Sequence, residues 1–101
     1  PTGIRALIDE NWVLKIYSRS SLGFKYRLWL DNLTGIIDSD YSNSDNEGHI
    51  FIKMTNNSLE DKIVRINRGD KFAQGIFVQY GTVIDDDVVE ERNGGFGSTN
   101  K

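Results

Sequence analysis

Asp38 and Arg19 stand in segments whose residue types suit hydrolysis at a phosphate. Asp38 follows the apolar run 35–37, so its carboxylate is expected at the rim of a sheet, where it can orient a water molecule. Arg19 precedes Ser20 and Ser21, and a guanidinium fork beside hydroxyls matches phosphate oxygens. Each segment also has a structural interpretation: a hairpin turn with local Asx-type bonds around Asp38, and a helix cap with a surface Arg at Arg19.

Aromatic and amide side chains elsewhere could take part in the same chemistry. Tyr41 offers a flat face for a sugar or a base. Gln74 lies in the segment 69–75, where Gly-Asp indicates a turn and Gln74 is otherwise an ordinary strand residue. The stretch 92–101 is rich in glycine and could wrap phosphates with backbone N–H groups, although it lacks the Gly-Lys-Ser/Thr signature of a Walker loop. Phe96 within it needs a surface to stack on, and a disordered tail is the alternative.

The elements that must position these residues are predicted to be strands. Two Ala stand against eleven Ile, six Val and five Thr, which favours pleated sheet over helix. No segment keeps helical apolar spacing for three turns, and short apolar runs alternate with Gly, Asn and Asp clusters. The predicted fold class is therefore all-β, a sandwich or barrel. Its expected strands cover residues 12–17, 24–30, 49–54, 63–66, 72–80, 82–84 and 88–89.

Length and charge exclude several classes of function. A chain of 101 residues suits one domain. A net charge of −3 argues against a general nucleic-acid surface, and no Cys and one His exclude a disulfide framework, a thiolate metal site and a multi-His site. His49 is interpreted as a strand residue. No apolar stretch approaches the roughly 18 residues of a membrane span, and no signal peptide is recognisable, so we expect no membrane partner and a cytoplasmic location.

Taken in order, four segments resemble motifs two to five of the trimeric dUTP pyrophosphatase (dUTPase) family, and the likeness covers essentially the whole chain. Residues 19–23, 32–41, 69–74 and 92–99 resemble these motifs, and residues 1–4 resemble the strand before motif two. The resemblance implies a jelly-roll or β-clip sandwich of the dUTPase type, with residues 1–91 as the β domain and 92–101 as a tail that closes over the active site. Motif one is missing, so we expect a fragment of a longer protein, incomplete at its N-terminus.

The resemblance also implies an activity and a role for each matching residue. The family hydrolyses dUTP to dUMP and pyrophosphate, a step of nucleotide metabolism, with Mg²⁺ held through phosphates and waters and no metal ligand in this segment. Asp38 matches the carboxylate that activates water, and Tyr41 the aromatic under the deoxyribose. The uracil-reading hairpin would use Asn32, Gly35 and Ile37, and Phe96 would stack on the base. The implied phosphate contacts are Arg19, Ser20, Ser21, Gln74, Arg92, Ser98 and Thr99. Family members are homotrimers with shared active sites.

Two departures and three rival functions accompany this resemblance. The connection 42–47 is longer than is usual in the family, and the tail has Asn100 where Gly is common. A dCTP deaminase shares the jelly roll and an Arg-Ser-Ser-Leu motif, but Lys53 occupies the place of its catalytic Glu. A non-catalytic homologue that senses nucleotides or binds protein is a second alternative, against which the retention of Asp38, Tyr41, Gln74 and Phe96 argues. An unrelated β-sandwich interaction module would leave the order of the motifs as coincidence.

Overall fold

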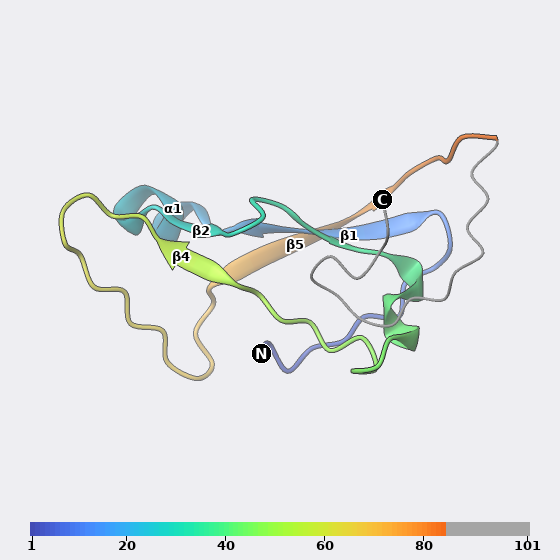
Figure 1. The fold of residues 1–101 in the computed structure, drawn as a ribbon, viewed down its shortest axis with the longest axis horizontal. Helices are drawn as coiled ribbons and strands as arrows, with labels where there is room; N and C mark the ends of the chain where they lie inside the picture. Colours follow the sequence, from blue (N-terminus) through green and yellow to red (C-terminus); the bar gives the residue numbers. More distant parts are fainter. Residues whose placement is uncertain (85–101) are drawn as a thin grey trace.

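The computed structural model describes residues 1–84, and the predicted tail residues Arg92, Phe96, Ser98 and Thr99 lie outside the described residues. Within the described part, the elements follow in the order β1–α1–β2–β3–η1–β4–β5. The molecule is elongated and measures 48 × 25 × 22 Å along its principal axes (Figure 1). The pair β1 and β5 runs along the long direction, with α1 near one end.

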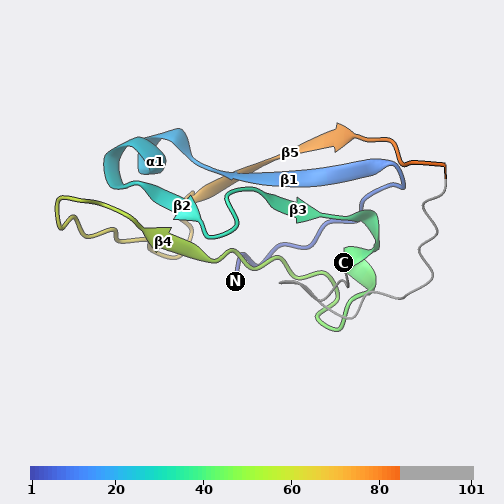
Figure 2. The ribbon, with the colours of Figure 1, turned by 45° about the horizontal axis from the view of Figure 1, so that its top comes forward.

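The larger sheet is built around β1 (Trp12–Ser18). This strand pairs antiparallel with β3 (Gly35–Ile37) on one edge and with β5 (Ala73–Gln79) on the other, so the order is β3-β1-β5 (Figure 2). Leu14 in β1 therefore has a register partner in each neighbouring strand. Sheet pairing satisfies the backbone N–H and C=O groups of β1 on both edges. The all-β fold class is confirmed, and the jelly-roll connectivity stays a prediction.

The predicted strand 24–30 is wrong in its first half. Residues Ser20–Tyr26 form α1, which ends at Arg27 in the left-handed region (φ 51°), and β2 covers Leu28–Leu30. Phe24 is 89% exposed, so its side chain does not pack against the sheet as a strand residue would. The Arg27 N–H donates to the Gly23 carbonyl oxygen at 2.9 Å and closes the helix. A short alternation of apolar and charged residues, as in 24–26, fits either a strand or a helix. The backbone hydrogen bonds show that this segment is a helix.

The other differences concern strand length. The predicted strand 49–54 contributes only its last residue to β4 (Met54–Asn56), which pairs with β2. Residues 63–66 and 82–84 form no strand, and 88–89 lie outside the described residues. The segment before β4 bonds instead to the chain's beginning. The Thr2 N–H donates to the Ile50 carbonyl oxygen at 3.0 Å, and the Ile50 N–H donates to the Ile4 carbonyl oxygen at 2.9 Å.

The hydrophobic core is small. Ile16, Leu30, Tyr41 and Ile50 form a cluster in which each residue is 3–6% exposed, with partly buried residues such as Leu14 packed against it. Among the described residues, no side chain falls below 2% exposure. Several large apolar side chains remain more than two-thirds exposed instead: Leu7, Phe24, Leu33, Leu59 and Ile63. Apolar packing thus fixes the middle of the sheet and leaves the outer segments to hydrogen bonds.

His49 acts as a hydrogen-bond acceptor that holds the first residues of the chain. Its Nε2 accepts the Gly3 N–H at 3.0 Å, and its ring centroid lies 4.5 Å from that of Phe51. It does not lie in a strand, although it follows the polar connection as predicted. Residues 1–84 contain no helix that is long and apolar enough to cross a membrane.

Substitution of Gly48 by Ala is expected to destabilise the fold. Gly48 has a φ of +82°, and an added Cβ would lie 2.7 Å from the Ser42 Cα, a distance real Cβ atoms essentially never show. We expect the free energy of unfolding to fall by about 2 kcal/mol or more, measured by chemical denaturation. The control is Gly23→Ala in α1, where nothing lies within 4 Å of the added atom. This change should stabilise by about 0.5–1 kcal/mol. Equal stability of the Gly48→Ala protein and the unsubstituted one would contradict the structural assignment.

Candidate functional site

The serine pair predicted to contact phosphate lies at the start of α1. Arg19 occupies the N-cap position with extended backbone (φ −77°, ψ 139°), and its side chain makes no capping hydrogen bond. Ser20 and Ser21 are exposed in the first turn. The N-cap backbone therefore serves the helix through the Arg19 carbonyl oxygen, which accepts the Gly23 N–H at 2.8 Å. The segment therefore starts a helix, as the structural interpretation predicted, but the Arg19 guanidinium does not cap it.

Gln74 lies beside this turn although 56 positions separate it from Ser18. In the β1–β5 register Ala73 is opposite Ser18 and Gln74 is opposite Tyr17. The Gln74 Nε2 donates to the Ser18 carbonyl oxygen at 2.8 Å. Gln74 is therefore not an ordinary strand side chain, because it ties β5 to the residue that precedes Arg19. Two of the segments singled out in the sequence meet here.

The turn before β5 forms as predicted. The Asp70 Oδ2 accepts the Asn67 N–H at 2.8 Å, and the Asp70 N–H donates to the Asn67 carbonyl oxygen at 3.0 Å. Gly69 adopts a φ of +91°, a conformation that suits glycine. The Gly-Asp pair therefore shapes the approach to β5 and leaves Gln74 as the residue of this segment that reaches the turn after β1.

Asp38 directly follows β3 at the opposite end of the sheet. Gly35 is opposite Ile16 and Ile37 is opposite Leu14. A Cβ on Gly35 would lie 3.3 Å from the Ile16 Cβ, so glycine lets the hairpin lie close against β1. Asp38 is half-buried and forms the N-cap of the 3-10 helix η1 (Ser39–Asn43).

Asn32 lies in the turn that opens the hairpin. The Leu33 N–H donates to the Leu30 carbonyl oxygen at 2.9 Å, and Leu33 adopts a φ of 66°. The Thr34 N–H donates to the Asn32 carbonyl oxygen at 2.7 Å. The turn 31–34 joins β2 to β3, which pair in different sheets, β2 with β4 and β3 with β1. This turn and β3, referred to as the hairpin segment, contain every residue predicted to read the base apart from Phe96.

Tyr41 is placed differently from the open flat face that its sequence position suggested. It is 6% exposed and belongs to the core cluster. Its hydroxyl donates to the His49 carbonyl oxygen at 3.0 Å, and its N–H donates to the Asp38 carbonyl oxygen at 3.1 Å. The ring is therefore held by the same turn that begins at Asp38, and its contact with a sugar stays a prediction.

The connection 42–47, interpreted from the sequence only as a longer loop, is an ordered polar structure. Ser44 in it is 6% exposed, and its Oγ donates to the Asn46 Oδ1 at 2.8 Å. The sequence signal that could have indicated this order is an Asn two residues before a Gly, since Asx side chains bond to N–H groups two residues on. Gly48 N–H does donate to the Asn46 Oδ1, at 3.1 Å.

One chain does not bring the two clusters together. Ile37 is opposite Leu14, so Asp38 lies level with Val13, whereas Arg19 follows the other end of β1. Six residues of strand separate these positions, which corresponds to about 20 Å at 3.3 Å per residue. Figure 1 shows the same separation, with α1 at one end of the long axis and the green 3-10 turn at the other. We refer to the turn of Arg19 with Gln74 and to the segment that ends at Asp38 as the two candidate half-sites.

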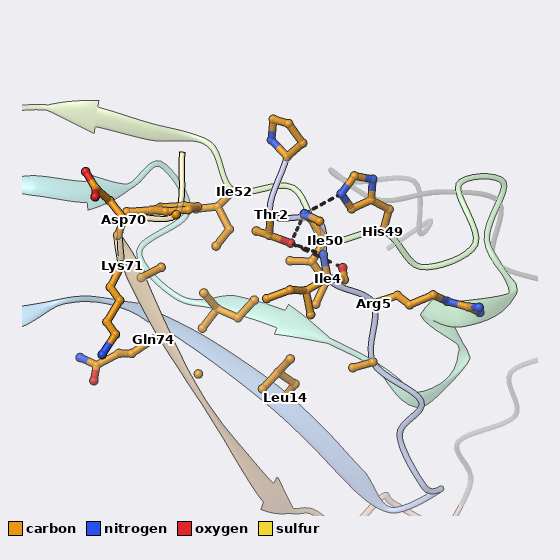
Figure 3. Close-up of a pocket in the computed structure, with 18 of the residues that line it drawn as sticks. Thr2, Ile4, Arg5, Leu14, His49, Ile50, Ile52, Asp70, Lys71 and Gln74 are labelled. Carbon is orange, nitrogen blue, oxygen red and sulfur yellow. Dashed lines mark hydrogen bonds between the residues drawn. The ribbon is translucent and has the colours of Figure 1, made fainter. Parts of the chain in front are cut away.

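A broad hollow of about 1170 Å³ lies over the core face of the sheet (Figure 3). Its walls come from β1 and β5, from residues 1–7 and from residues 66–72, and they carry mainly apolar side chains such as Leu14 and Ile52. Of the predicted site residues in the described part, only Gln74 lines it. Cationic side chains also line the hollow, namely Arg5, Arg68 and Lys71.

The described residues provide no cage for a metal ion. Within residues 1–84, no three His, Cys, Asp or Glu side chains are grouped so that they could hold one. The hydrogen bond from Lys62 and its positive charge lower the pKa of the exposed Glu60 carboxyl. Lys62 also donates to the Lys25 carbonyl oxygen at 3.0 Å and ties this loop to α1.

The fold and the two half-sites define a predominantly β protein with a carboxylate hairpin at one end of its central strand and an Arg-Ser-Ser turn at the other. The chain belongs to the dUTPase family, whose model matches residues 1–100. The family assignment made from the motifs is therefore confirmed.

Relatives of known name agree with this assignment. The deoxyuridine 5'-triphosphate nucleotidohydrolase of Lactococcus lactis is 46% identical over 103 residues, which cover 98% of this chain and 67% of that protein. The protein of the same name from Mannheimia succiniciproducens is 37% identical over 107 residues, which cover 100% of this chain and 66% of that protein. A crystal structure of dUTPase from Streptococcus mutans matches with a TM-score of 0.72 and 39% identity, over 82% of this chain and 64% of that one. The chain thus spans about two thirds of the length of these relatives.

Proposed function

We propose that this chain hydrolyses dUTP to dUMP and pyrophosphate as one subunit of a homotrimer with shared active sites. The similarity to the lactococcal deoxyuridine 5'-triphosphate nucleotidohydrolase, over nearly the whole chain, is the observation that carries the proposal. The position of Asp38 supports it, because a carboxylate at the end of a hairpin strand lies next to the backbone groups that would read the base.

In this proposal Asp38 is the general base that orients water for attack on the α-phosphorus. Backbone groups of Gly35 and Ile37 would pair with the edge of uracil, and a tight turn would leave no room for the 5-methyl group of thymine. Cytosine would present an amino group to a donor, and buried hydrogen-bonding sites reject such mispaired analogues strongly.

The second half-site would bind the phosphates. Arg19 with Ser20 and Ser21 offers a guanidinium and two hydroxyls, and Gln74 is held beside them by its bond to the Ser18 carbonyl oxygen. We propose that Mg²⁺ is bound by the triphosphate and waters, since Mg²⁺ keeps several waters and the described residues offer it no ligand cluster. When bound, the ion would offset negative charge on the phosphates. Arg92, Phe96, Ser98 and Thr99 would close over the ligand.

The separation of the half-sites supports a shared site. Asp38 and Arg19 lie about 20 Å apart along β1, as estimated from the strand rise, whereas in-line attack needs the reacting atoms within about 3–3.5 Å. A complete site would therefore combine the hairpin of one subunit with the Arg19 turn of another. Exposed apolar side chains such as Leu7 and Leu33 are available for contacts between subunits.

The reaction is tested by Mg²⁺-dependent pyrophosphate release from dUTP, with dCTP, dTTP and UTP measured in parallel. We expect release from dUTP alone, and its loss on chelation of the metal. Ammonia release from dCTP would favour the deaminase alternative. Nucleotide binding by a folded protein without any release would favour the non-catalytic homologue.

Asp38→Asn should abolish turnover and preserve binding. Loss of a general base lowers kcat by about 10²–10⁴-fold, whereas the amide keeps the shape of the side chain. We therefore expect the affinity for dUMP, measured by calorimetry, to change less than about threefold, which is under 1 kcal/mol. Asp45→Asn, the same change at an exposed position, is the control. If binding disappears together with turnover, Asp38 has a structural role.

Gln74→Glu should weaken substrate binding. The new carboxylate cannot donate to the Ser18 carbonyl oxygen, and it repels phosphate oxygens. We therefore expect KM for dUTP to rise about 10-fold or more, which corresponds to a loss of about 1.4 kcal/mol of binding free energy for each factor of ten. Gln79→Glu at the far end of β5 adds the same charge to the same strand and should leave KM unchanged. An equal rise in both variants would show a general charge effect and remove Gln74 from the phosphate site.

Mixed trimers test the sharing of sites. Asp38→Asn and Arg19→Ala subunits should each be inactive alone. If a site takes Asp38 from one subunit and Arg19 from another, random assortment of equal amounts restores about one quarter of the sites. Activity after co-refolding, measured against the unsubstituted protein, should therefore recover to about that fraction. Absence of any recovery, with mixed trimers shown by mass spectrometry, would place both residues in one subunit's site.

A further inference from the structure

Asn46 is the centre of the hydrogen-bond network that orders the connection 42–48. Its Oδ1 accepts from the Ser44 Oγ at 2.8 Å and from the Gly48 N–H at 3.1 Å. Its Nδ2 donates to the Tyr41 hydroxyl at 3.1 Å and to the His49 carbonyl oxygen at 3.2 Å. The amide thus joins the loop that follows η1 to the ring that η1 carries.

Tyr41 is held at both ends of its side chain. The ring packs in the core cluster with Ile16 and Ile50, and the hydroxyl donates to the His49 carbonyl oxygen while it accepts from Asn46. Apolar contacts tolerate small slides along a surface, whereas two hydrogen bonds of opposite sense at the ring's tip fix its position and tilt. Asn46 and the His49 carbonyl oxygen together therefore fix how far the ring reaches.

The same turn carries the proposed catalytic carboxylate. The Tyr41 N–H donates to the Asp38 carbonyl oxygen at 3.1 Å, so a shift of Tyr41 is transmitted to the start of η1. Gly48 closes the loop from the other side, where its φ of +82° and its close approach to Ser42 admit no side chain. In this arrangement the loop satisfies Asn46, Ser44 and Tyr41 together.

We propose that Asn46 is a positioning residue for Tyr41 and that it thereby sets the discrimination between deoxyribose and ribose. This inference rests on the proposed function, in which Tyr41 packs under the sugar. A ring that sits about 1 Å deeper or more tilted would leave room for a 2′-hydroxyl, and errors of this size change rates by up to about 10²-fold. In this proposal Asn46 acts through the tyrosine.

An amide is required because both of its ends are used. Asp in place of Asn46 would keep the acceptor for the Ser44 hydroxyl and the Gly48 N–H, and would lose the donor to Tyr41 and to the His49 carbonyl oxygen. The substitution therefore removes both bonds that the Asn46 amide donates and keeps both bonds that it accepts. A Tyr41 hydroxyl that turned to donate to the new carboxylate would give up its bond to the His49 carbonyl oxygen, so the positioning of the ring changes in either case. Asn43→Asp is the matched control, because Asn43 is exposed at the end of η1 and receives the same change of charge and size.

The experiment measures the affinities for dUMP and UMP by calorimetry, together with kcat/KM for dUTP and UTP. We expect Asn46→Asp to lower the preference for the deoxyribose ligand about tenfold or more, within the range that one missing hydrogen bond can cause. Asn43→Asp should leave that preference unchanged. A proportionate loss for both sugars, or an unchanged preference in folded Asn46→Asp protein, would show a purely structural role and overturn the inference.

Tyr41→Phe provides the second variant. It removes the hydroxyl from the other side of the same bond and should shift the preference in the same direction. Asn46→Asp added to Tyr41→Phe should then change the preference no further, because the bond is already absent. Additive effects, or an unchanged preference in Tyr41→Phe, would overturn the inference. Calorimetry requires no turnover, so absence of dUTP hydrolysis in the unsubstituted protein would overturn only the proposed function. Equal affinity of the unsubstituted protein for dUMP and UMP would overturn the inference itself.

Discussion

The hydrogen bonding of β1 along both of its edges is the constraint on which the rest of the structure depends. β3 and β5 each pair with one edge of β1, so neither can slide without breaking its hydrogen bonds to β1. A slip of β1 itself by one residue would turn Leu14 and Ile16 away from the core. The register consequently places Gln74 beside the turn after Ser18 and Asp38 level with Val13. The separation of Gln74 from Asp38 along the sheet follows from this one strand.

A rigid strand also explains why the functional groups are divided. A hairpin that reads a base with backbone atoms must be held against a sheet, and Gly35 permits the necessary closeness to Ile16. A turn suited to phosphates needs open hydroxyls, which Ser20 and Ser21 present where α1 leaves the sheet. These two features lie at opposite ends of β1, and the proposed trimer would bring them together.

Polar interactions fix positions where apolar packing is sparse. The buried cluster around Leu30 and Ile50 is small, and the ordered polar loop after η1 begins directly beside Tyr41, at the cluster's edge. The same principle holds the first residues of the chain, where His49 accepts the Gly3 N–H. Directional bonds are better suited than apolar contacts to place a ring or a strand end precisely, because their energy falls steeply with angle and distance.

The sequence by itself determined the fold class and the family, because β-branched composition and ordered motifs are local properties, whereas the roles of the individual site residues stay predictions. It also indicated the turn at Gly69-Asp70. Only the tertiary structure decided that Phe24 lies in a helix, that Tyr41 is buried, and that Gln74 meets Ser18 while Asp38 lies at the other end of β1. Strand pairing and core packing join residues that lie far apart in the chain, and no local pattern encodes which partner each of them finds.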